Sequence, residues 1–169
     1  MESGYREVVI SGINLGRWGR DLDFSPQPSD LGQITSKVQG RTSKVRSATP
    51  DLPLLICAIL RETNLEKLRI SSVEPMDWTD DLIALVASSP RIAKHAHVPM
   101  QSGSDAVLRR MHRKYRPWHY REKIEKIRGA MPSAAIGADV MVGFPGESEG
   151  EFEATRRLIE ELPFTYLPV

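Results

Sequence analysis

The chain has 169 residues, 40% of them hydrophobic, and its 23 lysines and arginines against 22 aspartates and glutamates leave a formal net charge of +1. This balance suits one soluble globular domain, in which any nucleic-acid surface must come from local clusters of basic residues. No apolar run approaches the roughly 20 residues of a membrane span, no signal-peptide pattern is present, and the single cysteine, Cys57, excludes an internal disulfide and an all-cysteine metal site built from this chain alone. We therefore expect a cytoplasmic protein that does not enter a membrane.

The first predicted strand is Glu7–Ser11, a β-branched run that we expect to be buried. It leads into the loop Gly12–Asp21, where three glycines and Asn14 allow positive φ angles and close approach of the backbone to a ligand. The alternative is an ordinary connecting loop.

A change of composition marks Asp23–Pro50, which is rich in proline, serine and threonine and has few large apolar residues. Such a segment cannot bury much surface, so we predict a flexible insertion within the domain. Its basic residues are better explained by a solvated linker than by an RNA contact.

Leu52–Leu60 predicts a helix that is buried on most sides, with Cys57 as a small core residue. The next strand, Lys67–Ser71, ends in a segment that carries Ser71, Ser72 and Glu74, and a helix over Asp80–Ala87 follows.

The centre of the sequence is His95–Arg116. A strand over Ala93–Val98, stopped by Pro99, delivers His97, Gln101 and Ser102 to a polar turn. Ser104 then caps a helix that runs from Asp105 to about Met111. Taken alone, this turn could be no more than a helix cap.

Basic and aromatic residues alternate over Arg109–Arg121, where bases could stack on aromatic rings while cations meet phosphates. The candidate RNA contacts are Arg109, Arg113, Lys114, Tyr115 and Arg116. A helix surface whose aromatic rings fold inward is the alternative, and Tyr120–Gly129 is a predicted amphipathic helix.

A further strand over Ala134–Val142 ends in the loop Gly143–Ser148, and Ser148 with Glu151 predicts a capping box for the helix Glu149–Glu161. Phe164–Val169 resembles the beginning of another strand. This repeated strand–helix order predicts an α/β fold, a partial (β/α) TIM-like barrel that is incomplete at both ends. A flat, doubly wound sheet is the alternative. In either fold the polar strand exits lie along one rim and favour a ligand site there.

Three stretches of the sequence resemble the radical S-adenosylmethionine methylthiotransferases. They are Leu-Arg-Ile-Ser-Ser-Val-Glu-Pro, His-Val-Pro-Met-Gln-Ser-Gly-Ser-Asp-Ala-Val-Leu-Arg-Arg-Met-His-Arg-Lys-Tyr and Gly-Ala-Asp-Val-Met-Val-Gly-Phe-Pro-Gly-Glu. The segment Ser-Val-Glu-Pro-Met-Asp-Trp is most similar to the branch that acts on threonylcarbamoyl-adenosine in tRNA. The branches that act on isopentenyl-adenosine or on a ribosomal-protein aspartate are less similar.

The resemblance implies a radical SAM core spanning residues 1–169, with S-adenosylmethionine and a [4Fe–4S] cluster as cofactors and tRNA as the partner. In this family a deoxyadenosyl radical, formed from S-adenosylmethionine, leads to methylthiolation of the adenine at C2 beside the anticodon. The cofactor-binding residues that the resemblance and the strand exits imply are Asn14, Ser71, Ser72, Glu74, His97, Gln101, Ser102, Val142, Gly143 and Phe144. We expect Glu74 to accept hydrogen bonds from ribose hydroxyls. Val140, Val142 and the backbone of Gly143 and Phe144 are expected to form a flat apolar wall for adenine.

The Cys-x-x-x-Cys-x-x-Cys motif of this family is absent, as are its N-terminal and C-terminal domains. One cysteine cannot replace three thiolates, so we expect this chain alone to be inactive and to depend on missing domains or a complementary chain. Two readings remain beside it: a non-catalytic RNA-binding barrel fragment, and an unrelated barrel lyase or isomerase that uses Glu74 and His97 as base and acid.

Overall fold

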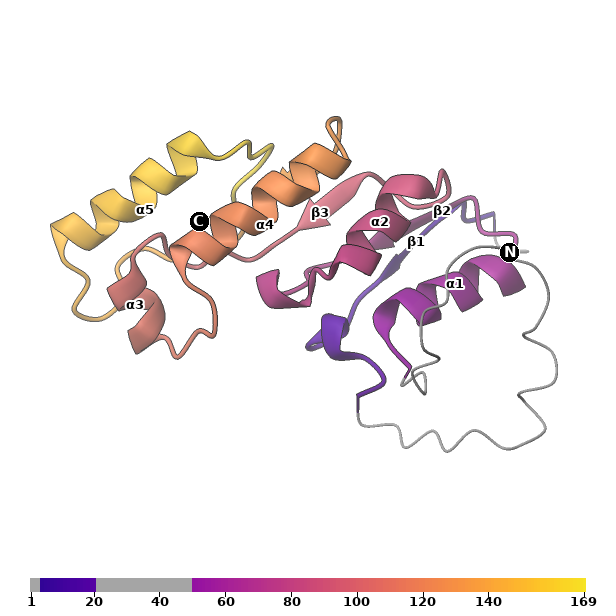
Figure 1. Cartoon of the computed structure of the whole chain (residues 1–169), viewed down its shortest axis with the longest axis horizontal. Coiled ribbons are helices and arrows are strands. Elements are labelled where there is room, and N and C mark those ends of the chain that lie inside the picture. The colour runs from indigo at the N-terminus through magenta and orange to yellow at the C-terminus, as the bar shows by residue number, and fades with distance from the viewer. Residues whose placement is uncertain (1–3, 21–49) are drawn as a thin grey trace, which may run out of the picture.

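The computed structural model describes residues 4–20 and 50–169, so the predicted insertion lies outside the described residues apart from Pro50. Within the described part, short parallel strands alternate with longer helices, as predicted (Figure 1). Across these ranges no helix combines the length and the apolar character needed to cross a membrane.

The strands form a strip in which spatial order follows chain order. Parallel pairing joins β1 to β2 and β3 to β4, and isolated bridges between Leu68 and Ile92 and between Ser72 and His97 connect the two pairs. The predicted last strand reaches β4 only through a bridge between Gly137 and Tyr166. The strand bounds are β1 Glu7–Ile10, β2 Lys67–Ile70, β3 His95–His97 and β4 Ala135–Gly137.

Helices follow each strand, and local capping signals explain where they begin. Side chains of Asp51, Thr79, Ser104 and Ser148 each accept a hydrogen bond from a backbone amide in the first turn, and the capping box at Ser148 is present as predicted. The helices are α1 Leu52–Glu62, α2 Asp80–Ser88, α3 Asp105–Arg110, α4 Pro117–Ala130 and α5 Glu149–Glu161, with short 3₁₀ turns at Leu15–Arg17 and Pro75–Asp77.

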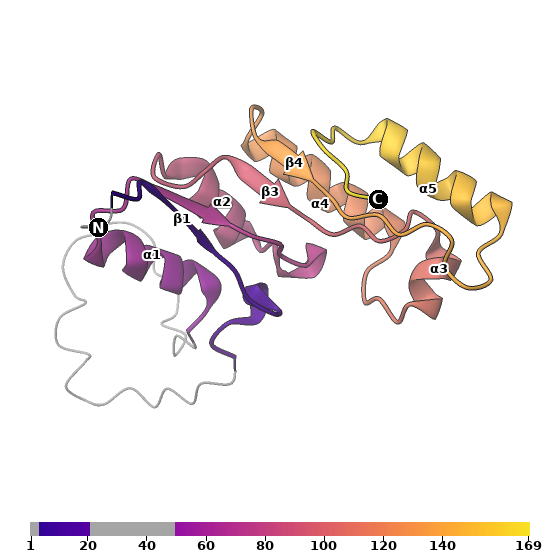
Figure 2. The same ribbon diagram turned by 180° about the vertical axis from the view of Figure 1, so that it is seen from behind.

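This order favours a barrel-type strip over a doubly wound sheet. The strands lie in front of α2 and α4 when the molecule is seen from behind (Figure 2), whereas a doubly wound sheet carries helices on both faces and reverses its strand order. The core lies between strands and helices and includes Leu68, Ile70, Ala96, Ile136, Ile56, Leu82 and Ile124. The described strip stays open, so what is observed is a mixed α/β fold with small parallel sheets and no closed barrel.

Two predictions of burial are wrong. Within residues 4–20 and 50–169, β1 pairs on one side only, with β2, and its Val8 and Val9 remain 42% and 53% exposed. In α1 only one face meets the core, through Leu52 and Ile56, whereas Cys57 is exposed. Since residues three apart share a helix face, Leu54 and Cys57 point together towards solvent.

Candidate functional site

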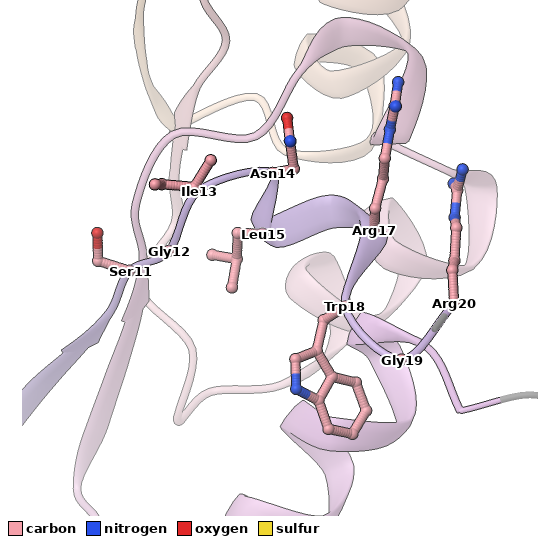
Figure 3. Close-up of a pocket in the computed structure, with 9 residues that line it drawn as sticks. All are labelled: Ser11, Gly12, Ile13, Asn14, Leu15, Arg17, Trp18, Gly19 and Arg20. Carbon is pink, nitrogen blue, oxygen red and sulfur yellow. The ribbon is translucent and has the colours of Figure 1, made fainter. Parts of the chain in front are cut away.

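The loop after β1 lines a cavity at the carboxyl edge of the strands. This open cavity of about 710 Å³ is lined by residues of the loop Ser11–Arg20. Figure 3 shows Asn14, Arg17 and Arg20 pointing to the same side of the loop, while Trp18 points the other way. Asn14 holds φ at 55°, the left-handed conformation that the sequence predicted for this loop.

A smaller cavity, of about 150 Å³, joins this loop to the segments after β2 and α3. It brings together Asn14 and Glu74 from the predicted cofactor set with Arg113, Lys114 and Tyr115 from the predicted RNA set. Members of the two predicted sets therefore meet at one place on the rim.

Ion pairs hold the arginines in and beside the wall of this smaller cavity. Nη1 of Arg113 donates to Oε1 of Glu74 at 3.1 Å. Each of these two side chains is about one-third exposed. Asp77, whose side chain is only 4% exposed, accepts from Arg17 at 3.4 Å and from Arg20 at 3.0 Å. No local pattern predicts the pairing of Arg17, Arg20 and Asp77, since the partners lie 60 and 57 residues apart along the chain.

A second polar group lies on the open face of the strip, around His97. Its Nε2 lies 3.0 Å from Oδ2 of Asp139, and its Nδ1 lies 3.0 Å from the hydroxyl of Tyr166. The same hydroxyl lies 2.7 Å from Nε2 of His95. His95 and His97 share this face because alternate residues of a strand point to the same side.

The partners determine the direction of these hydrogen bonds. An ionised carboxylate can only accept, so Nε2 of His97 donates to Asp139. In the tautomer with its one proton on Nε2, Nδ1 of His97 accepts from the Tyr166 hydroxyl. Nε2 of His95 then donates to the Tyr166 oxygen. The four side chains form one chain of hydrogen bonds that ends at Asp139, which is 44% exposed.

Gln101 has an unusual backbone for its residue type. Its φ is 65°, and the strip holds it there because its amide donates to the Asp139 carbonyl and its carbonyl accepts from the Met141 amide. Left-handed conformations of this kind, in residues other than glycine, concentrate at functional sites. The half-buried Gln101 side chain therefore stays a candidate for ligand contact.

The predicted serines divide between the rim and the core. Ser72 is exposed beside His97, whose carbonyl accepts from the Val73 amide, and Ser71 is half-buried. Ser102 is only 1% exposed, and its hydroxyl lies 3.1 Å from that of Thr155 and accepts from the Ser104 amide. Ser102 is therefore enclosed between the turn and α5, and its hydroxyl is engaged within the protein.

Val142, Gly143 and Phe144 lie beside α3 and α5 and line neither cavity. Val142 is 46% exposed, the Gly143 amide donates to Oε2 of Glu147 at 2.6 Å, and the guanidinium of Arg110 lies 6.0 Å from the centre of the Phe144 ring. The segment predicted to form the adenine wall thus lies in a loop away from the cavity at Glu74.

Most of the predicted RNA contacts are engaged within the protein. Arg109 and Arg116 both pair with Asp105, at 2.9 Å and 3.1 Å. Tyr115 is 1% exposed, its hydroxyl donates to the Met100 carbonyl at 3.0 Å, and burial raises its pKa. The buried Tyr115 ring therefore cannot stack on a base. Lys114 is the exposed member of the predicted set that makes no salt bridge among the described residues.

Ligands for an iron–sulfur cluster are not offered by this chain. A [4Fe–4S] cluster takes cysteine thiolates, and the sequence has Cys57 alone, on the outer face of α1. Among residues 4–20 and 50–169 no three histidine, cysteine, aspartate or glutamate side chains gather as a metal site would require. The residues present do not fit the cluster.

Comparisons with known proteins give matches over nearly the whole chain. The sequence model described as "Radical SAM superfamily" matches residues 37–159. The threonylcarbamoyladenosine tRNA methylthiotransferase MtaB of Bacillus subtilis is 34% identical over all of this chain and 32% of its own length. The tRNA-2-methylthio-N(6)-dimethylallyladenosine synthases of Syntrophobacter fumaroxidans and Streptomyces viridosporus are 38% and 37% identical, over 97% and 95% of this chain and 31% and 27% of their own lengths. The chain thus spans about a third of the relatives it matches.

Proposed function

The chain belongs to the radical SAM superfamily, and from this premise we propose that it forms part of the core of a tRNA methylthiotransferase that modifies an adenosine at C2. The observation that carries the proposal is the similarity, at 34–38% identity and over 95–100% of this chain, to relatives named for that activity. The superfamily implies S-adenosylmethionine and a [4Fe–4S] cluster as cofactors.

The proposed substrate is a hypermodified adenosine of tRNA. Both threonylcarbamoyladenosine and dimethylallyladenosine enzymes are among the relatives, at similar identities. The Ser-Val-Glu-Pro-Met-Asp-Trp segment favours the threonylcarbamoyladenosine branch.

S-adenosylmethionine, when bound, supplies both the radical and the methyl group. We assign it to the rim between the segments after β2 and β3, where Ser72 lies beside His97 and the half-buried Gln101 is held in a left-handed conformation. Hydroxyl and amide side chains there could orient the polar ends of the cofactor. Glu74 could accept from its ribose hydroxyls, in exchange for part of its contact with Arg113.

Calorimetric titration of the purified chain with S-adenosylmethionine tests this assignment. We expect binding, and we expect Ser72→Arg to abolish it, since a bulky cation beside His97 would repel the sulfonium. The matched control is Ser133→Arg, at an exposed turn after α4. Equal affinity of the two variants, or no binding by the unaltered chain, would contradict the proposal.

The proposal includes inactivity of this chain on its own. Because Cys57 is the one thiol present, no step can be assigned to a cluster held by these residues. Anaerobic reconstitution with iron and sulfide should leave the chain and its Cys57→Ser variant with the same low iron content. About four irons per chain, lost in the Cys57→Ser variant, would contradict this part of the proposal.

A further inference from the structure

The smaller cavity on the rim carries more positive than negative charge. Arg17 and Arg20 share the single carboxylate of Asp77, and Arg113 pairs with Glu74. The salt bridges of the described residues leave the exposed Lys114 without a carboxylate. Of the residues that line the cavity, Arg17, Arg113 and Lys114 are cationic and Glu74 alone is acidic, and this surplus of positive charge favours an anion.

The size of the cavity limits what the anion can be. At about 150 Å³ it is smaller than the roughly 300 Å³ at which pockets for drug-sized ligands begin, so one small group fits it. A tetrahedral phosphate is such a group. Arginine forks and a lysine ammonium are the side chains that bind phosphate in proteins.

The backbone around the cavity is held in conformations that need support. Asn14 and His112 both have φ at 55°, and both line this cavity. They are two of the three non-glycine residues with positive φ in the described part of the chain, the third being Gln101. Such conformations cluster where a loop is shaped to meet a ligand.

An exposed aromatic residue lies close by in the sequence. Trp118, in the first turn of α4, is 56% exposed, and its ring packs edge-on against His119 at 5.5 Å. Tryptophan normally buries much of its surface, whereas single-stranded nucleic acids stack their bases on exposed aromatic rings. A cationic cavity followed by such a ring suits a phosphate that is part of an RNA chain.

We propose that the cavity between Arg17 and Lys114 binds a backbone phosphate of RNA, with Trp118 as a stacking surface for a neighbouring base. The inference rests on the proposed function for RNA as the partner, and it assigns the contact to particular residues. It also replaces the predicted contact set, because Arg17 and Lys114 are now the principal cations and Tyr115 has no direct role.

The test measures the affinity of the purified chain for a labelled anticodon stem–loop at a series of salt concentrations. Fluorescence anisotropy of the label detects the binding. Affinity should fall with salt, and Lys114→Gln and Arg17→Gln should each weaken binding and reduce the slope of log K against log salt by about 0.7 to 1. The matched control, Arg61→Gln, removes an exposed cation of α1 and should leave both unchanged. Trp118→Ala should weaken binding at every salt concentration without changing the slope, whereas Phe152→Ala, at a 39% exposed ring of α5, should not.

Equal effects of Lys114→Gln and Arg61→Gln would overturn the inference, because binding would then depend on overall charge. If Lys114→Gln lowered affinity for S-adenosylmethionine and not for RNA, the cavity would hold the cofactor carboxylate, and the inference would also fall. Circular dichroism of each variant separates lost contacts from lost folding. Because cofactor titration is a separate measurement, S-adenosylmethionine binding together with salt-insensitive RNA binding would refute the phosphate site and leave the proposed function standing.

Discussion

The hydroxyl oxygen of Tyr166 lies 2.7 Å from Nε2 of His95, although 71 residues separate them in the chain. The two rings stack with an angle of 7° between their planes, and the same hydroxyl reaches Nδ1 of His97 at 3.0 Å. Tyr166 thereby fixes the segment after α5 to the open face of the strip. The contact stabilises the part of the fold in which sequence periodicity alone predicted a further strand.

Tyr166→Phe should lower the free energy of unfolding by about 1 kcal/mol. The change removes a hydroxyl that joins two imidazoles, and the cost stays small because Tyr166 is 37% exposed and water can replace part of the contact. Urea unfolding measures it, with Tyr5→Phe, at a 73% exposed ring, as the control. Equal stability of the two variants would show that the hydrogen bonds contribute nothing.

Stability should fall as the pH drops through the range in which histidine titrates. Burial lowers the pKa of His95 below its ordinary 6.5, helped by the positive charge of Arg69 and by His97, while the Ile70 carbonyl and Glu7 act weakly in the opposite direction. Between the lowered pKa of folded His95 and 6.5, the unfolded chain therefore binds more protons than the folded chain. The contribution of neutral His95 to the free energy of unfolding is complete above pH 6.5, and it is lost as the pH falls to the pKa of His95 in the folded chain.

His95→Gln should remove this pH dependence. Urea midpoints measured at about pH 7 and about pH 5 should differ less in the variant than in the unaltered chain. Glu151 and Glu153 do not interfere, since hydrogen bonds from arginines lower the pKa of each to about 2 and their contributions are lost only below 4.5. A variant with an unchanged difference would assign the effect to another group.

Local signals in the sequence predicted the helix starts well. Ser104 and Ser148 each bind an amide three residues further on, so a short stretch of sequence contains the whole interaction. The three resemblance stretches likewise predicted the superfamily, which the comparison confirms.

Features that depend on distant residues could not be predicted. Asp139 lies 42 residues from His97 and Asp77 lies 60 from Arg17, so no pattern in either segment names its partner. His95 and His97 share a face through the alternation of the strand, but no local pattern shows that Tyr166 meets them. The same limit explains Cys57, because the face that α1 turns to the core depends on where the strip lies.

Gly137→Ala should disturb the Tyr166 contact from the opposite side. A Cβ at this position would lie 2.0 Å from Cζ of Tyr166, so the ring would have to move away from β4. We expect a loss of about 1–3 kcal/mol in unfolding free energy. The control is Gly150→Ala in α5, where no heavy atom lies within 4 Å of the added Cβ.

A double-mutant cycle identifies the cause of that loss. In a Tyr166→Ala background the ring is absent, so Gly137→Ala should cost much less than in the unaltered chain. Additive losses would show that the strand itself, and not the ring, rejects the methyl group.

Gly103, in the turn between β3 and α3, should tolerate substitution by alanine no better than Gly137 does. An added Cβ would lie 2.7 Å from Cα of Thr155 and 2.8 Å from the Ala154 carbonyl oxygen. Both are backbone atoms of α5, so the helix itself would have to move away. Gly103→Ala should therefore cost up to about 3 kcal/mol of unfolding free energy. Gly129→Ala, in α4 with open space around the added Cβ, should instead stabilise by up to about 1 kcal/mol through helix propensity. Because the glycine acts by letting α5 approach the turn, the loss should appear in urea unfolding, and a Gly103→Ala chain as stable as Gly129→Ala would contradict this packing.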